Sequence, residues 1–310
     1  MLWYIARRLL QMVPVFLGAT LIVYLLAFWS SEGTQIAAIV GEKPVSPAVK
    51  EQLRAQYNLD QPVLAQWLIY LGNIVQGDFG IGFNGRPIWT QIADAFPVTA
   101  RLAIIAIIVE TIFGVAAGLI SGLRKGTVID TALLMTSLLV IAVPTFVMGF
   151  VVQFVFGVRL DLIPVNVGRD PSWINLLAPG FVLGAVSFAY VLRLTRTSVI
   201  ESATADHVRT ATAKGLTRGG VVSKHILRNS LIPVVTFIGA DLGALMGGAI
   251  VTERIFNVPG VGTLLFQAIL DGESPMIVSL VTLLVIIFLL ANLIVDLLYA
   301  VLDPRIRYAK

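Results

Sequence analysis

Long apolar runs dominate the sequence, and most of them are uninterrupted by charge. A bilayer core is crossed by about 20 apolar residues in helical conformation, because every backbone polar group must be paired within the segment. Six runs reach that length: residues 9–31, 102–123, 131–158, 171–192, 229–252 and 274–295. The pattern therefore predicts an all-α, polytopic membrane protein with six transmembrane helices and both chain ends on the same side.

Basic residues are distributed unevenly between the two sets of connections. Fourteen of the 22 Lys and Arg residues lie on the side that carries both chain ends, and the other eight are spread over longer segments on the opposite side. Cytoplasmic loops carry an excess of Lys and Arg, so we expect both termini in the cytoplasm and the chain in the cell (inner or plasma) membrane. The net charge of +4 is then a topology signal, and no nucleic-acid partner is predicted.

The first apolar run follows Arg7 and Arg8, as it would in a signal peptide. It is longer than the usual hydrophobic region of about 7–15 residues, and no convincing cleavage site follows it. We therefore expect an uncleaved signal anchor. In this interpretation residues 1–31 form the first transmembrane helix, residues 32–97 an external segment, and residues 98–310 a five-helix core.

Composition narrows the class of protein. The chain is 57% hydrophobic and 13% charged, about half the charge of a soluble domain, so a lipid bilayer must cover much of its surface. The absence of Cys excludes disulfides and thiol catalysis, and with two His residues a metal site is not expected. The sequence also lacks the phosphate-binding loop, the nucleophile elbow and the zinc-protease motif. We expect a transport subunit rather than an enzyme, driven by a partner or by an ion gradient.

The connection between the fourth and fifth apolar runs is the most informative segment outside the membrane. Residues 204–218 predict a short helix, because their centre is rich in Ala and Gly215 is a natural stop. Asp206 near its start and Lys214 near its end also suit the helix dipole. Small side chains such as Ala211 would let another protein approach closely. The alternative is a solvated basic loop beside anionic lipid headgroups.

Residues 206–233 resemble the cytoplasmic signature of the permease subunits of ABC importers. The general signature is Glu-Ala-Ala, three residues, Gly, nine residues, Ile-x-Leu-Pro, of which this chain keeps Ala211, Gly215 and Leu227. Its other positions follow one subfamily, the dipeptide/oligopeptide/nickel permeases, and the chain most closely resembles the B-type dipeptide permease subunit. The likeness covers the whole chain and includes residues 7–9, 57–62, 77–80, 96–99, 253–262 and 302–308.

The resemblance implies a type I ABC importer permease fold and ATP-driven import of short peptides, with dipeptides favoured. It also implies a homologous C-type permease, two nucleotide-binding domains (separate or fused) and an extracytoplasmic substrate-binding protein. ATP and Mg would be bound by the partner subunits, and no cofactor by this chain. The short helix would be the coupling helix in a groove of the ATPase, with these coupling residues: Asp206, Arg209, Thr210, Ala211, Lys214, Gly215 and Leu216.

The external segment is too long for a simple connection. Its turn-rich residues 77–80 contain Asp78 and Phe79, and a later outer hairpin contains Glu253. We take these three residues as candidate contacts of an external partner. A structural cap over the pore mouth is an equal alternative for the segment.

Three acids occur in the apolar runs or at their edges: Glu110, Asp241 and Asp296. A charge near mid-membrane, as at Asp241, costs about 2.5–3.5 kcal/mol on insertion scales. We expect Asp241 to line the peptide route or to pair across the permease dimer; a locally hydrogen-bonded packing residue is the alternative. Glu110 is expected to be structural, and Asp296 to contact Arg or water. A proton-driven transporter that uses these acids as a relay is the rival hypothesis, although no inverted repeat is visible.

Glycines recur at every fourth position in two runs. One set is Gly114, Gly118 and Gly122, and the other is Gly239, Gly243 and Gly247. Such spacing places a smooth ridge on one helix face and lets another helix approach closely. The second set is predicted to lie at the dimer interface beside Asp241, or to pack within the chain.

Overall fold

The computed structural model describes residues 2–28, 36 and 46–302, and most of them are helical. Within these residues, five helices are long and apolar enough to cross a membrane, and a bent helix pair makes six when it counts as one span. The five are α1 (Leu2–Ala27), α5 (Ile88–Leu123), α8 (Leu177–Thr204), α11 (Arg228–Phe256) and α13 (Ser274–Leu302). The predicted all-α membrane fold is confirmed.

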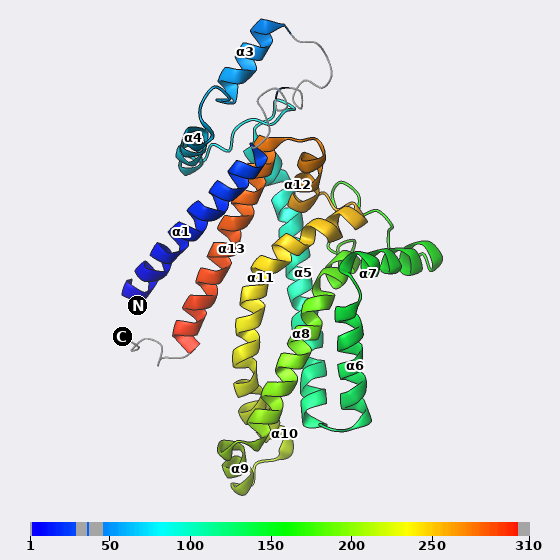
Figure 1. Cartoon of the computed structure of the whole chain (residues 1–310). Coiled ribbons are helices and arrows are strands. Elements are labelled where there is room, and N and C mark those ends of the chain that lie inside the picture. The colour runs from blue at the N-terminus through cyan, green and yellow to red at the C-terminus, as the bar shows by residue number, and fades with distance from the viewer. Residues whose placement is uncertain (1, 29–35, 37–45, 303–310) are drawn as a thin grey trace.

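The third predicted span is not one straight helix. Residues 131–158 divide into α6 (Val128–Ala142), α7 (Thr145–Val152) and a π-helix, η1 (Gln153–Arg159), with a bend of 101° after α6. The break follows from Pro144, which has no N–H to donate and which disfavours helical geometry in the preceding residue. Val143 is accordingly extended, with φ −87° and ψ 122°. Figure 1 shows α7 turned sideways, away from the bundle.

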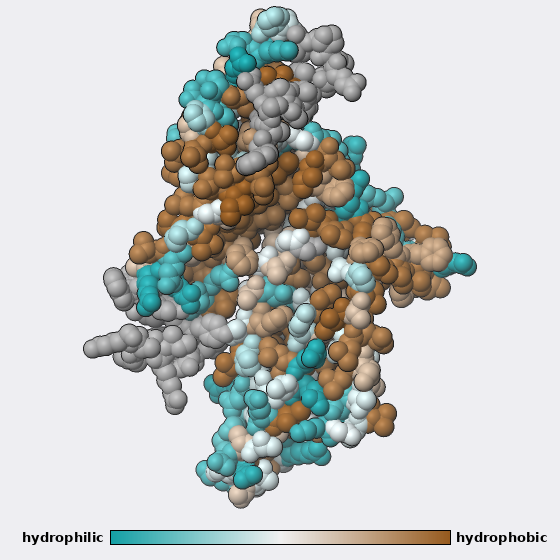
Figure 2. All heavy atoms as spheres, in the orientation of Figure 1, coloured by the Kyte–Doolittle hydropathy of each residue, from teal (hydrophilic) through white to brown (hydrophobic). Residues whose placement is uncertain are grey.

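The helices outside the spans gather at the two ends of the bundle (Figure 1). One end carries α3 (Pro47–Gln56), α4 (Val63–Val75) and α12 (Val261–Leu270), and the other carries α9 (Asp206–Ala213), α10 (Arg218–Val221) and η2 (Val222–Leu227). The start of α1 and the end of α13 lie side by side, where Arg8 forms an ion pair of 2.8 Å with Asp296. This confirms the expected Arg contact of Asp296. Figure 2 shows hydrophilic surface on the two end groups and hydrophobic surface between them.

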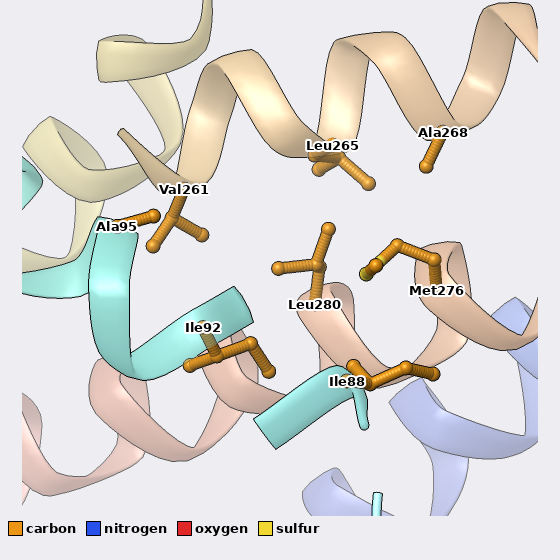
Figure 3. Close-up of a cluster of buried hydrophobic side chains, with 8 residues drawn as sticks. All are labelled: Ile88, Ile92, Ala95, Val261, Leu265, Ala268, Met276 and Leu280. Carbon is orange, nitrogen blue, oxygen red and sulfur yellow. The ribbon is translucent and has the colours of Figure 1, made fainter. Parts of the chain in front are cut away.

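Helix α5 starts much earlier than the sequence pattern indicated. It begins at Ile88, so the expected boundary at residue 97 falls inside the helix, and Pro97 lies within it. The early part of α5 is anchored in an apolar cluster with α12 and the start of α13 (Figure 3). Ile88 and Ile92 lie there against Val261, Leu265 and Leu280, all nearly or fully buried. The cluster fixes the end of the bundle that carries α3, α4 and α12.

The first glycine set joins α5 to α8. A Cβ added to Gly118 would lie 2.5 Å from the carbonyl oxygen of Leu192 and 2.5 Å from Cβ of Thr195. One turn to either side, a Cβ added to Gly114 would be similarly close to Val191, and one added to Gly122 would be similarly close to Val199. Backbone contact of this kind is the packing that small residues allow between membrane helices. The two helices therefore form a tightly packed pair.

A buried ion pair fastens the α5–α6 connection to α8. Arg196 donates from Nε to Oδ1 of Asp130 at 2.6 Å and from an η nitrogen to Oδ2 at 2.9 Å. The same carboxylate accepts hydrogen bonds from the hydroxyl of Ser121 at 2.5 Å and from the N–H of Gly126 at 2.8 Å. Two-pronged pairing of this kind fixes geometry as well as charge.

Removing the negative charge of the Arg196–Asp130 ion pair is expected to lower the stability of the folded chain. Asp130→Asn leaves Arg196 partly buried without its counter-ion, and we expect a loss of about 2–3 kcal/mol. The measurement is thermal unfolding of the solubilised protein. Asp94→Asn is the matched control, because Asp94 pairs with Arg86 at 3.4 Å with both side chains well exposed, and such pairs contribute about 1 kcal/mol at most. Equal losses of stability in the two variants would contradict the stabilising role of the Arg196–Asp130 ion pair.

Candidate functional site

The connection between α8 and α11 contains the short helix that the sequence predicted, although it is shorter than residues 204–218. Helix α9 runs from Asp206 to Ala213, with extended Ala205 before it and Lys214 as its last half-helical residue. Gly215 then takes φ +80°, the left-handed conformation that ends many helices and that glycine adopts without strain.

One face of α9 belongs to the core of this chain. Val208 and Ala211 are 7% and 4% exposed and form a cluster with Val199, Val221 and Ile226. Leu216 packs partly against the same cluster. This corrects the prediction for Ala211, whose small side chain permits close packing inside the chain and is not presented to a partner.

The opposite face of α9 is polar and exposed. Asp206, Arg209, Thr210 and Lys214 are all exposed, and the ion pair of 3.7 Å between Arg209 and Asp206 is open to solvent. Figure 1 places this helix at the extreme end of the molecule, beyond the spans. The arrangement offers a short, rigid, charged ridge to whatever lies on that side of the membrane.

Helix α9 is linked to α11 by a polar contact, and the segments on its two sides are linked to each other. The hydroxyl of Ser202, near the end of α8, donates to the carbonyl of Ile226, just before α11 begins. A side-chain nitrogen of His207 lies 3.0 Å from the amide nitrogen of Asn229, in the first turn of α11. Sequence reasoning missed His207, since its partner is 22 residues away. Displacement of α9 would therefore be passed to α11 through the His207 contact and to α8 through the cluster that contains Val199.

The second glycine set divides between two surroundings. Cβ atoms added to Gly239 and Gly243 would clash with Val295 and Phe288 of α13. These two glycines pack within the chain, which is the alternative that the sequence left open. A Cβ added to Gly247 would meet no atom within 4 Å, so this position is open to another molecule.

The two mid-membrane acids lie next to each other. Glu110 of α5 is fully buried, and its closest charged and polar neighbours are Asp241 of α11 and Ser187 of α8. Within the described part of the chain, neither carboxylate oxygen of Glu110 has a hydrogen-bond partner, and Oδ2 of Asp241 has none either. Asp241 and Ser187 line a cavity of about 380 Å³ beside Tyr190 and Phe237. Oδ2 of Asp241 therefore lacks a partner when both acids are ionised, and a proton held between Asp241 and Glu110 would provide one.

The three residues predicted to contact an external partner differ in accessibility. Asp78 is exposed, and one of its oxygens accepts the N–H of Gly80 at 2.8 Å. Phe79 is half-buried and stacks on Trp89 with ring centres 5.4 Å apart. Glu253 is fully buried, so its carboxylate is not accessible to an external partner.

Glu253 instead holds the outer hairpin together. Its carboxylate accepts the hydroxyl of Thr99 at 2.6 Å and the N–H of Thr263 at 3.0 Å, and Thr99 in turn accepts the N–H of Val261 at 2.8 Å. Burial raises the pKa of Glu253 to about 7, against the lowering effect of these hydrogen bonds. The residue links the consecutive helices α11 and α12 to α5, which lies far away in sequence.

The raised pKa of Glu253 predicts a pH dependence of stability. A carboxyl whose folded-state pKa lies above its unfolded value stabilises fully below the unfolded pKa of about 4.5, and loses that contribution as the pH rises to about 7. The wild type is expected to lose on the order of 3 kcal/mol of stability between these pH values, and Glu253→Gln should not show this loss. Melting temperatures of both proteins from pH 4.5 to 8 test this. Parallel curves would contradict the assignment.

The amino-acid sequence is similar to a known family and to permeases of known transport systems. Residues 114–308 match the family described as "Binding-protein-dependent transport system inner membrane component". The chain belongs to this family. It is also 34% identical to the dipeptide transport system permease protein DppB of Escherichia coli K12, over 340 aligned positions that cover all of both chains. It is 38% identical to the glutathione transport system permease protein GsiC of the same strain, over 99% of this chain and all of the relative.

Membership of this permease family confirms the resemblance seen in the sequence. The chain is a multi-pass component of the inner membrane and the membrane part of a binding-protein-dependent system. The matched residues include α9, Gly247 and Asp241, and Glu110 lies just before them. In the described residues, no cluster of three or more His, Asp or Glu is arranged to hold a metal ion.

Proposed function

We propose that this chain is one pore-forming permease subunit of an ATP-driven ABC importer that moves short peptides into the cytoplasm. Its termini and α9 lie on the cytoplasmic side, in keeping with the excess of Lys and Arg on the connections at that end. ATP and Mg are bound by two nucleotide-binding domains on partner subunits, and an external binding protein delivers the peptide.

The observation that carries this proposal is the construction of α9. Its buried face packs against α8, α10 and η2 through Val208 and Ala211, whereas its exposed face carries Arg209 and Thr210. A helix built in this way is a coupling helix: the ATPase holds the exposed face, and the buried face passes the movement to the spans. Gly215 and Leu216 set its end.

Short peptides are the cargo class that the relatives support. One relative is named for dipeptide transport and another for glutathione transport, and both align with essentially the whole chain. Dipeptides are the first cargo to test, with tripeptides second. The ligand held by the cognate binding protein identifies the cargo directly.

The test of the transport reaction is uptake by membrane vesicles that contain the assembled system. We expect uptake of a radiolabelled dipeptide to require ATP and binding protein and to continue when a proton uncoupler is added. Uptake that needs no ATP and stops with the uncoupler would instead support a proton-driven carrier that uses Glu110, Asp241 and Asp296.

A second, homologous permease completes the pore, and the open position at Gly247 marks where we expect it to pack. Gly247→Val adds bulk where this chain has none, so the isolated subunit should fold normally and bind its partner permease less well. Co-purification of the two permeases from mild detergent measures this. The control is Gly72→Val, another open helical glycine, on α4. Undiminished pairing in Gly247→Val would remove this position from the interface.

The binding protein is expected to contact the external segment at Asp78 and the adjoining part of Phe79. The exposure of Asp78 supports this placement, and the buried position of Glu253 excludes Glu253 from the contact.

A further inference from the structure

The cavity between α7, α8 and α11 combines one acid with two aromatic rings. Its volume is about 380 Å³, and its lining includes Ser187, Tyr190, Phe237 and Asp241. The rings of Tyr190 and Phe237 lie 6.0 Å apart at 33°. The rest of the lining is mainly aliphatic, and Asp241 supplies its charge. An apolar chamber with a single carboxylate is suited to a small ligand that carries one positive charge.

The two acids of the site need either a proton or a cation to balance their charge. Glu110 is fully buried next to Asp241, and its two oxygens have no hydrogen-bond partner among the described residues. No ion pair in that part of the chain includes either acid. Two neighbouring carboxyl groups in a medium of low dielectric constant cannot both ionise without a compensating cation. The pair must therefore share a proton or receive a cation.

We propose that this cavity binds the primary ammonium group of a peptide as it crosses the membrane. The assignment rests on the proposed peptide cargo. An ammonium group has three N–H donors and no acceptor. The Asp241 carboxylate supplies the counter-charge, the Ser187 hydroxyl supplies a further acceptor, and the faces of Tyr190 and Phe237 stabilise the cation. Glu110 keeps its proton and remains beside Asp241.

Asp241 and Glu110 have different roles in this site. Glu110 does not line the cavity, whereas its polar neighbours Asp241 and Ser187 do. A protonated Glu110 donates one hydrogen bond and adds no second negative charge. The site then carries a single charge, so a cationic group binds there without the strong retention that two ionised carboxylates would cause.

Carbodiimide labelling in native membranes tests the site. Dicyclohexylcarbodiimide is apolar and reacts with protonated carboxyl groups in membrane interiors, so we expect adducts on Glu110 or Asp241 by peptide mass spectrometry. Alanine amide, which carries a free ammonium group, is added at about four times its dissociation constant and should slow labelling about fivefold. N-acetylalanine amide has no ammonium group and should not slow it.

Variants sharpen the test. Asp241→Asn should retain labelling at Glu110 but lose the protection by alanine amide, whereas Phe237→Leu should keep both acids and show weaker protection. No adduct on either acid in the wild-type chain, or equal protection by the acetylated compound, overturns the site. ATP-driven uptake measured in the same membranes keeps the two proposals apart: uptake without amine protection refutes this site alone, and protection without uptake refutes the proposed function alone.

Discussion

Thr210→Trp is expected to abolish most ATP-driven uptake and to leave the chain folded in the membrane. Thr210 is on the exposed face of α9, opposite Val208 and Ala211. An indole there does not disturb the internal cluster but occupies the space into which the ATPase must fit. Because a few central residues dominate most protein interfaces, we expect uptake to fall roughly tenfold or more. The measurements are peptide uptake by vesicles and the amount of ATPase that co-purifies.

The control for this variant is Lys125→Trp. Lys125 is exposed on the α5–α6 connection at the same end of the molecule, outside α9. It should retain uptake and ATPase binding. If Thr210→Trp kept both activities, the exposed face of α9 would not be the docking surface.

Gly118→Val is expected to destabilise the transmembrane bundle strongly. Its Cβ would lie 2.5 Å from a backbone oxygen of α8, and a backbone atom cannot move aside as a flexible side chain can. Overpacking costs about 1–3 kcal/mol and occasionally more, and the upper end applies where two backbones are in contact. The amount of monodisperse protein after extraction and its melting temperature measure this loss.

Gly18→Val is the matched control, since Gly18 lies on α1 and an added Cβ meets nothing within 4 Å. It should behave as the wild type. Normal yield and stability of Gly118→Val would mean that α5 and α8 are not in backbone contact.

The spans were readable from sequence because the bilayer demands long apolar helices whatever else the chain does. The bend in the third span was only partly predictable from the sequence. A proline such as Pro144 indicates a kink or a helix start, but the 101° angle also depends on the packing of α7 against α8 and α11. The first turns of α5 were hidden because polar residues such as Gln91 interrupt their apolar pattern, and the cluster with α12 that holds them is formed by segments far apart in sequence.

The candidate site was predicted to a similar degree. Asp206 and Gly215 mark the ends of α9 by local chemistry alone, and the structure agrees. Which face of α9 is buried was not predictable, because it depends on Val199 and Ile226 in other helices. The proximity of Glu110 and Asp241 was equally hidden, since 131 positions separate them in sequence.

The coupling role of α9 can be tested directly because the chain has no cysteine of its own. Thr210→Cys places the single thiol of the chain on the exposed face of α9, and a short thiol-to-amine cross-linker is applied to membranes that contain the assembled system. We predict a cross-linked product that contains an ATPase subunit, and none from Trp173→Cys, an exposed position far from α9. A product without ATPase, or ATPase captured equally from both positions, would contradict the role of α9 as the coupling helix.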